Sequence, residues 1–184
     1  MKDTLRQYEK EVKSCRHIFI KKTVDYGTSW RVLRMISILD QLFIKASRIR
    51  TLQQRGVSLV KEDIRGEFQA LVNYGIIGLI QLDLNTDTIE DLDPGKAGGL
   101  YDEKIQLLQQ VMEKKNHDYG EAWREMSQEG FVDLILMKLL RIRQILANDG
   151  KTLVSEGIDA NLTDIINYSL FALIGIDEGR HKAG

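Results

Sequence analysis

Charged side chains interrupt an otherwise apolar stretch of the chain between Phe131 and Arg143. Asp133, Lys138 and Arg141 stand there among phenylalanine, valine, leucine and isoleucine residues. In a helix, where each residue turns by about 100°, Lys138 and Arg141 share a face and Arg141 lies about 80° from Asp133. A charge buried without a partner is strongly destabilising. The pattern therefore indicates either an ion-pair network between helices or a polar cleft in which a ligand completes the pairing.

Oxygen-bearing side chains recur further along the chain at helical spacing. Asp164, Asn167 and Tyr168 are spaced to share one edge of a helix, and Glu156 and Asp159 are three residues apart. Carboxylates placed this way suit Mg²⁺, which uses one or two protein carboxylates together with substrate phosphates. Glu156, Asp159 and Asp164 are therefore the candidate metal ligands. Acids near the start of a helix also complement its dipole, and that interpretation stays open for Glu156 and Asp159.

A third set of reactive side chains lies in a passage that occurs twice. KKTVDYGTSWR at 21–31 returns as KKNHDYGEAWR at 114–124. An aromatic face can stack a base, and lysine and arginine can hold phosphate oxygens. The ligand-binding candidates in the second copy are Lys115, Asp118, Tyr119, Trp123 and Arg124. A structural interpretation is equally open, in which the glycine turns the chain after a helix and the tryptophan anchors the next element in the core.

The two halves of the chain resemble each other well beyond this passage. An offset of 93 residues repeats the three charges of the apolar stretch as Asp40, Lys45 and Arg48. An offset of 94 residues repeats Asn167, Tyr168 and Glu156 as Asn73, Tyr74 and Glu62, whereas Ala70 stands at the position of Asp164. Folding alone would favour apolar matches, so the many polar matches point towards a site.

Apolar residues at helical spacing predict the elements that position these side chains. Each half contains three amphipathic segments. Five of them run approximately over residues 5–19, 38–52, 100–112, 131–146 and 158–173, and the sixth is the third helix of the first half. Gly56 and Gly150 stand where helices should end, and Ser155 is a candidate N-cap. No segment alternates with a period of two residues, so we expect an all-α fold.

Pro94 is the single proline, and it lies in a stretch of acidic, threonine and glycine residues between the halves. We therefore expect a first helical repeat at 1–82, a linker at 83–99 and a second repeat at 100–184. Each three-helix unit alone would expose an apolar face. Packing the two repeats together would bury both faces in one compact bundle with a pseudo-two-fold arrangement.

Composition excludes several classes of partner. The formal net charge of −1 creates no overall field that would attract nucleic acid or an anionic membrane. The apolar runs are far shorter than the ~20 residues that span a bilayer. The single Cys15 cannot form an internal disulfide, and the charged N-terminus lacks the apolar core of a signal peptide. We expect a cytoplasmic protein that binds a nucleotide or another small phosphorylated ligand, with homo-oligomers left open.

The motifs K-x-x-D-Y-G-x-x-W, D-x-x-x-x-K-x-x-R-I and D-x-x-N-Y resemble, in this order, the bacterial and phage family called nucleotide modification associated domain 1. The second half carries all three motifs, and the first half departs from the third motif at Ala70. That family is in turn distantly similar to the all-α nucleoside triphosphate pyrophosphohydrolases, the MazG-like and dimeric dUTPase-like proteins. Those enzymes carry an E-x-x-E pair on one helix, where this chain has Asp133, Lys138 and Arg141.

The resemblance implies one of two functions. The first is a Mg²⁺-dependent nucleotide pyrophosphohydrolase with Asp133 and Asp164 as catalytic carboxylates and Glu156, Asp159 and Asp164 around the metal. Its expected ligand-binding residues are Lys115, Arg124, Lys138 and Arg141 near the phosphates, Tyr119 or Trp123 near the base, and Asp118, Asn167 and Tyr168. The second is a non-catalytic nucleotide-binding or assembly module, in which the paired charges are structural or accept a ligand without turnover.

Overall fold

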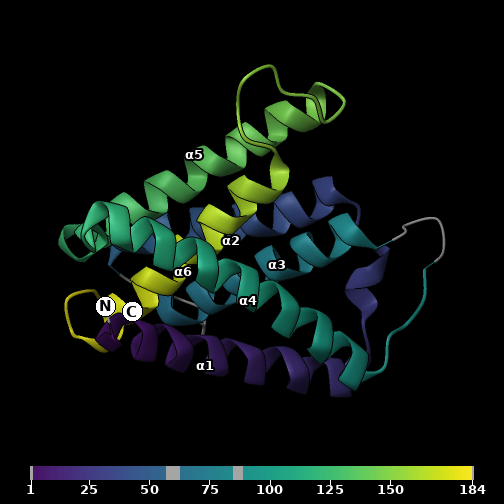
Figure 1. The fold of residues 1–184 in the computed structure, drawn as a ribbon, viewed down its shortest axis with the longest axis horizontal. Helices are drawn as coiled ribbons and strands as arrows, with labels where there is room; N and C mark the ends of the chain where they lie inside the picture. Colours follow the sequence, from purple (N-terminus) through teal and green to yellow (C-terminus); the bar gives the residue numbers. More distant parts are fainter. Residues whose placement is uncertain (1, 57–62, 85–88, 184) are drawn as a thin grey trace.

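The structure, a computed structural model, describes residues 2–56, 63–84 and 89–183, and helices account for most of them. The α-helices are α1 (Lys2–Tyr26), α2 (Met35–Arg55), α3 (Ile64–Asp83), α4 (Pro94–Tyr119), α5 (Gln128–Ala147) and α6 (Ile158–Asp177) (Figure 1). Two short 3-10 helices, η1 (Ser29–Val32) and η2 (Ala122–Glu125), follow α1 and α4. No strand occurs within the described ranges, so the predicted all-α fold is confirmed.

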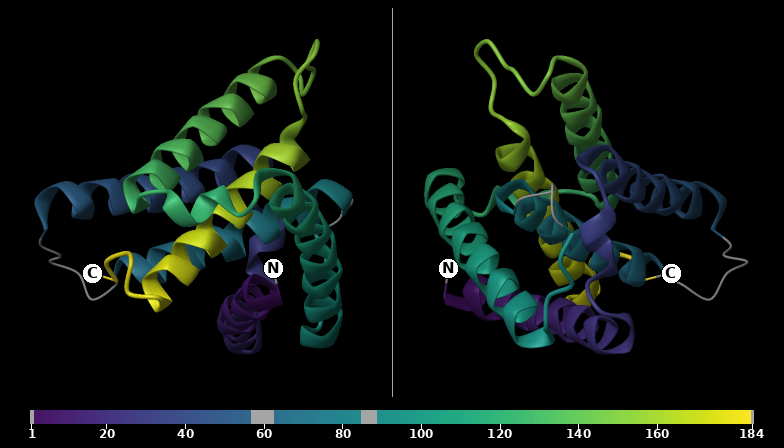
Figure 2. Two further views of the ribbon diagram at one scale, coloured as in Figure 1. Left: turned by 60° about the vertical axis from the view of Figure 1, so that its left-hand side comes forward. Right: turned by 90° about the vertical axis from the view of Figure 1, so that its right-hand side faces the viewer.

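The helices form three layers, with α3 and α6 in the middle. The pair α1 and α4 covers one side of this central layer, and the pair α2 and α5 covers the other (Figure 2). Burial follows the layers, because α3 and α6 carry the most apolar sequences and are buried over most of their surface. The outer helices are amphipathic and bury one stripe each.

The two repeats are related by a pseudo-two-fold arrangement. Each helix of the first repeat packs against its counterpart in the second, so that α1 contacts α4, α2 contacts α5 and α3 contacts α6. The central crossing is close because α3 has glycines there. A Cβ atom on Gly75 would lie 2.5 Å from Cγ1 of Ile166, and one on Gly78 would lie 3.0 Å from Cδ1 of Leu162. These glycines let the backbones of α3 and α6 approach each other.

The helix boundaries confirm some predictions and correct others. Gly56 ends α2 in the left-handed conformation with a φ of 69°, as expected. Gly150 also has a positive φ, but α5 already ends at Ala147, and Gly150 belongs to the turn that follows. The prediction of Ser155 as an N-cap is wrong, because α6 begins at Ile158 with Gly157 at the cap.

The predicted linker is shorter than expected because its last residues are helical. α4 begins at Pro94, where proline suits the first turn of a helix, and the Asp93 side chain caps the new helix by accepting a hydrogen bond from the Lys96 amide. Among the described residues, none of the helices combines the length and apolar character needed to cross a bilayer.

Candidate functional site

The repeated DYG passage forms the turn that ends the first helix of each repeat. α1 ends at Tyr26 and α4 at Tyr119, and the glycines that follow, Gly27 and Gly120, have φ angles of 69° and 60°. Two hydrogen bonds stabilise the first of these turns, since the amide and the hydroxyl of Thr28 both donate to the Asp91 carboxylate at 2.7 Å. The structural interpretation of the glycine is therefore confirmed.

Both tryptophans of the passage are buried, but their surroundings differ. Trp123 stacks on Phe171 with ring centroids 4.3 Å apart and planes 5° apart, and the Arg124 guanidinium lies 4.4 Å from its ring centroid. Its faces are occupied, so Trp123 anchors η2 and is not open to a base. No ring among the described residues stacks on Trp30, and Phe19 is tilted by 40° against it with ring centroids 6.4 Å apart.

Arg124, which we expected near ligand phosphates, is held by protein groups instead. Its guanidinium forms ion pairs with Glu121 at 3.1 Å and Glu178 at 2.8 Å. It also donates hydrogen bonds to the Thr4 hydroxyl and the Gln7 side chain. Arg124 therefore joins η2 to the start of α1 and the end of α6.

Asp164 and two lysines form the polar cluster of the second repeat. The Asp164 carboxylate accepts from Lys115 of α4 at 2.5 Å and lies 2.6 Å from Nζ of Lys138 of α5. Asp164 and Lys138 are almost completely buried. Partial burial acts to lower the pKa of Lys115, but the hydrogen bond and charge of Asp164 outweigh it, and the pKa is raised. The structure thus brings together three residues that the sequence singled out separately.

Tyr168, Arg141 and Glu156 lie around this cluster. Burial and then the charge of Asp164 raise the pKa of the Tyr168 phenol, while Lys115 and Arg141 act in the opposite direction. The Tyr168 ring packs at a tilt against Phe131. Arg141 and Glu156 are exposed. The charges influence one another, but both carboxylate oxygens of Asp164 are already engaged by lysines.

Asp133, the other expected catalytic carboxylate, contacts a different helix. It pairs with Arg50 of α2 at 2.9 Å, and the equivalent pair in the opposite direction joins Asp40 to Arg143 of α5 at 3.5 Å. All four side chains are exposed. No ion pair or hydrogen bond between described residues links Asp133 to Asp164, so this carboxylate is part of a reciprocal contact between the repeats.

The candidate metal ligands are not gathered into one group. Asp164 is buried, whereas Glu156 and Asp159 are exposed near the start of α6. Within residues 2–56, 63–84 and 89–183, no three histidine, cysteine or acidic side chains are grouped so that they could hold a metal ion. Glu62, the repeat counterpart of Glu156, lies outside the described residues.

Asn167, expected to bind ligand, instead links the two repeats inside the core. It accepts a hydrogen bond from the Tyr8 hydroxyl at 2.7 Å, and Asn73 accepts the equivalent bond from Tyr101 at 2.9 Å. Tyr8 and Tyr101 are themselves 93 residues apart, the offset that relates the first two helices of the repeats. The repeated residues identified from the sequence begin only at Lys21. Applying the same offset to the residues before Lys21 would have revealed this pair of tyrosines.

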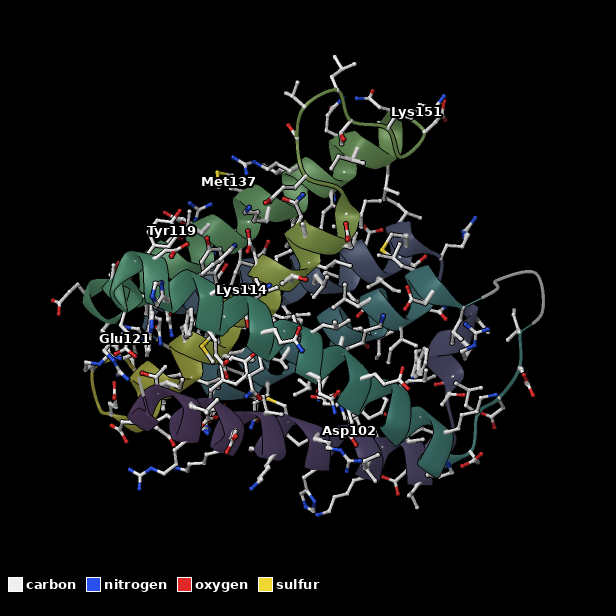
Figure 3. All side chains as sticks on the ribbon, in the orientation of Figure 1. Asp102, Lys114, Tyr119, Glu121, Met137 and Lys151 are labelled. Carbon is white, nitrogen blue, oxygen red and sulfur yellow. The ribbon has the colours of Figure 1, made fainter. Side chains whose placement is uncertain are left out.

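Asp118 and Tyr119 remain on the surface at the end of α4. Tyr119 is 72% exposed and lies near the end of α4 (Figure 3). Asp118 contacts its neighbour His117 at 3.1 Å. His117 and Asp118, together with Glu113 and Lys114, border a shallow depression. The described residues at the end of α4 thus border an open surface at this DYG passage.

A cavity of about 410 Å³ opens instead at the DYG passage of the first repeat. It lies between the end of α1, η1, α2 and α3. Its aromatic wall consists of Phe19, Tyr26, Trp30 and Tyr74, and its polar groups include Lys22, Thr23, Gln41, Gln69 and Asn73. The volume is within the range of small-molecule binding sites.

A smaller side chain beside the tryptophan of the first repeat explains why a cavity opens at Trp30. Ile77 stands at the repeat position of Phe171, the ring that stacks on Trp123. Ile77 and Trp30 both line the cavity, so the space filled by a phenyl ring in one repeat is partly open in the other. This difference was not singled out from the sequence, because only the packing of the helices reveals its consequence.

Of the described residues that line the cavity, Lys22 is the one lysine or arginine, and none is an aspartate or glutamate. Lys22 is exposed and has no ion-pair partner among the described residues, unlike its counterpart Lys115. The cavity therefore combines an aromatic wall with one available positive charge, a combination suited to a planar ligand that carries an anionic group.

The comparisons with known proteins agree with the duplication. The family described as nucleotide modification associated domain 1 matches residues 22–82 and 115–176, one segment in each repeat. Comparison with curated proteins and comparison with solved structures return no match.

Proposed function

The chain belongs to the nucleotide modification associated domain 1 family, and we propose that it binds a nucleotide in the cavity of the first repeat without hydrolysing it. The observation that carries this proposal is the pairing of an aromatic wall with Lys22 in a cavity of about 410 Å³. The family description is the reason for preferring a nucleotide over other planar anions.

The cavity offers a distinct group for each part of a nucleotide. The indole of Trp30 and the phenol rings of Tyr26 and Tyr74 provide surfaces for a base or sugar. Lys22 supplies a charge for phosphate oxygens. Gln41 carries an amide that can both donate and accept hydrogen bonds at the edge of a base, and Gln69, whose Nε2 donates to the Ser14 hydroxyl at 2.9 Å, has a carbonyl oxygen that can accept one.

The carboxylates of residues 2–56, 63–84 and 89–183 do not fit the magnesium site that a hydrolase would need. Both oxygens of Asp164 are engaged by Lys115 and Lys138, and none of the described residues that line the cavity carries a carboxylate. A protein Mg²⁺ site typically uses one or two carboxylates together with the substrate phosphates. We therefore assign no hydrolytic step to these residues.

Calorimetric titration with nucleosides and their mono- and triphosphates, with and without Mg²⁺, tests the proposal. We expect one binding site per chain and no requirement for Mg²⁺. Lys22→Met should weaken binding of the phosphorylated ligands about tenfold or more, because one charge-assisted hydrogen bond is lost. Lys21→Met is the matched control, because Lys21 is also exposed but does not line the cavity.

Release of pyrophosphate or phosphate is measured in the same samples. Mg²⁺-dependent release that Asp133→Asn or Asp164→Asn abolishes in a folded protein would favour the pyrophosphohydrolase and contradict our proposal. Failure of every nucleotide in the panel to bind the wild-type protein would also contradict it.

A further inference from the structure

The second repeat contains an anion beside the lysine that is available in the first repeat. Asp164 accepts from Lys115, the counterpart of Lys22, at 2.5 Å. Its own counterpart in the first repeat is Ala70, 94 residues earlier. Ala70 and Lys22 both line the cavity. The position that holds a carboxylate in one repeat therefore faces open space in the other.

In the first repeat, Lys45 and Arg48 of α2 have a carboxylate partner at another position of α3. Glu67 lies one helical turn before Ala70 on α3, is buried, and pairs with Lys45 at 3.3 Å and with Arg48. Its counterpart in α6 is Asn161, whose amide donates to the Gly157 carbonyl at 2.7 Å. The acidic residue that pairs with the α2 or α5 lysine therefore stands one helical turn earlier in α3 than in α6. Lys45 keeps a carboxylate partner as Lys138 does, and Lys22 alone loses the partner that Lys115 has.

We infer that the anionic group of the ligand occupies the place beside Ala70 and Lys22 that the Asp164 carboxylate occupies in the second repeat, and that the ligand is a nucleoside monophosphate. This inference rests on the proposed function. In the second repeat the equivalent place is filled by protein side chains, because Asp164 pairs with Lys115 and Phe171 stacks on Trp123.

The charge of the cavity supports a monophosphate. Among the described residues that line it, Lys22 is the one lysine or arginine, and none is an aspartate or glutamate that could recruit a divalent cation. A triphosphate carries several negative charges that this lining cannot neutralise, and their desolvation would be unfavourable. One phosphate group beside one ammonium is the better match.

Ala70→Asp tests this inference, with Ala70→Asn as the control of nearly equal size. Aspartate at this position should pair with Lys22 as Asp164 pairs with Lys115, so it should reduce affinity for a nucleoside monophosphate at least about tenfold more than asparagine does. Affinity for the unphosphorylated nucleoside should change equally in the two variants. In the Ala70→Asp protein, a further Lys22→Met substitution should have little additional effect on monophosphate affinity.

The outcomes separate this inference from the proposed function. If no nucleotide binds the wild-type protein, the proposed function fails first. If the wild-type protein binds nucleotides but Ala70→Asp and Ala70→Asn reduce monophosphate affinity equally, the placement of the anion is wrong. Tighter binding of the triphosphate than of the monophosphate, measured without Mg²⁺, would overturn the ligand class. Circular dichroism and thermal unfolding of each variant confirm that the fold is retained.

Discussion

The hydroxyl of Tyr8 donates a 2.7 Å hydrogen bond to Asn167, 159 residues away, and the two residues belong to different repeats. Tyr101 and Asn73 form the same bond in the opposite direction. Each asparagine amide also donates to a backbone carbonyl of its own repeat, that of Cys15 or Leu108. Burial raises the pKa of both phenols, which therefore remain donors. This reciprocal pair joins the repeats through buried polar groups.

Removing either hydroxyl should destabilise the protein. Tyr8→Phe or Tyr101→Phe leaves a buried asparagine oxygen without its tyrosine donor, and we expect each to reduce the free energy of unfolding by about 1–3 kcal/mol in a urea titration. Tyr119→Phe, at a tyrosine that is 72% exposed, is the control and should change stability by less than about 0.5 kcal/mol. Equal effects at the buried and exposed positions would contradict the role of these bonds.

The crossing of α3 and α6 should not tolerate a larger side chain. Gly75→Ala would place a methyl group 2.5 Å from Cγ1 of Ile166. We expect this overpacking to reduce the free energy of unfolding by about 1–3 kcal/mol. Gly99→Ala is the matched control in α4, where nothing lies within 4 Å of an added Cβ. There the better helix propensity of alanine should stabilise by up to about 1 kcal/mol. Chemical unfolding of both variants measures the contrast, and a stabilised Gly75→Ala protein would show that the helices are further apart.

The two carboxylates once expected to act together should differ in their effect on stability. Asp164→Asn leaves Lys138 buried without its full charge partner, and removal of one partner of such a pair costs about 3–5 kcal/mol. Asp133→Asn breaks an exposed pair with Arg50 and should cost about 1 kcal/mol or less. Adding Lys138→Met to Asp164→Asn should restore part of the lost stability. Equal costs for the two single variants, measured by urea unfolding, would contradict this assignment.

Glu11 and Asp177, which share Arg65, should give opposite pH dependences of stability. Arg65 pairs with Glu11 at 2.7 Å and with Asp177 at 2.8 Å, and Lys10 also contacts Asp177. Burial, followed by the hydrogen bond with Asp177, raises the pKa of Glu11. Burial acts to raise the pKa of Asp177 too, but the hydrogen bonds from Lys10 and Glu11 outweigh it, and that pKa is lowered.

The signs follow from proton linkage. The stability that Glu11 contributes is complete below its unfolded pKa of about 4.3, and it is lost as the pH rises through its folded pKa. The stability that Asp177 contributes is present above its unfolded pKa of about 3.9, and it is lost as the pH falls through its folded pKa. Glu11→Gln should therefore gain stability relative to the wild type between pH 4 and 8. Asp177→Asn should be destabilised near neutral pH and approach the wild type in acid. Parallel pH profiles of the two variants in thermal unfolding would refute this.

Much of the secondary structure could be predicted from local patterns. Apolar spacing indicated the helices, and Gly56 was correctly placed at a helix end, because both depend on neighbouring residues. Ser155 was wrongly predicted as an N-cap because its residue type favours a cap, whereas α6 begins three residues later, at Ile158. The first residues of α4 were missed because threonine, glycine and acidic residues suggested a linker, while Asp93 and Pro94 in fact begin the helix.

The candidate site was harder to predict because it depends on partners from distant helices. Lys115, Lys138 and Asp164 were each singled out, but their mutual pairing requires α4, α5 and α6 to meet. Asn167 was taken for a ligand contact because a buried hydrogen bond to a tyrosine in another repeat leaves no local pattern.

By itself, the sequence determined the all-α class, the duplication and the turn after each DYG passage, since helical periodicity and a positive φ are properties of short segments. The tertiary structure decided which polar residues were structural and where space remained. In the second repeat Phe171 and Asp164 fill the room beside the tryptophan and the lysine, and in the first repeat Ile77 and Ala70 do not. Volume and charge balance are set by side chains that meet only when the helices pack, and for that reason the cavity emerged only from the fold.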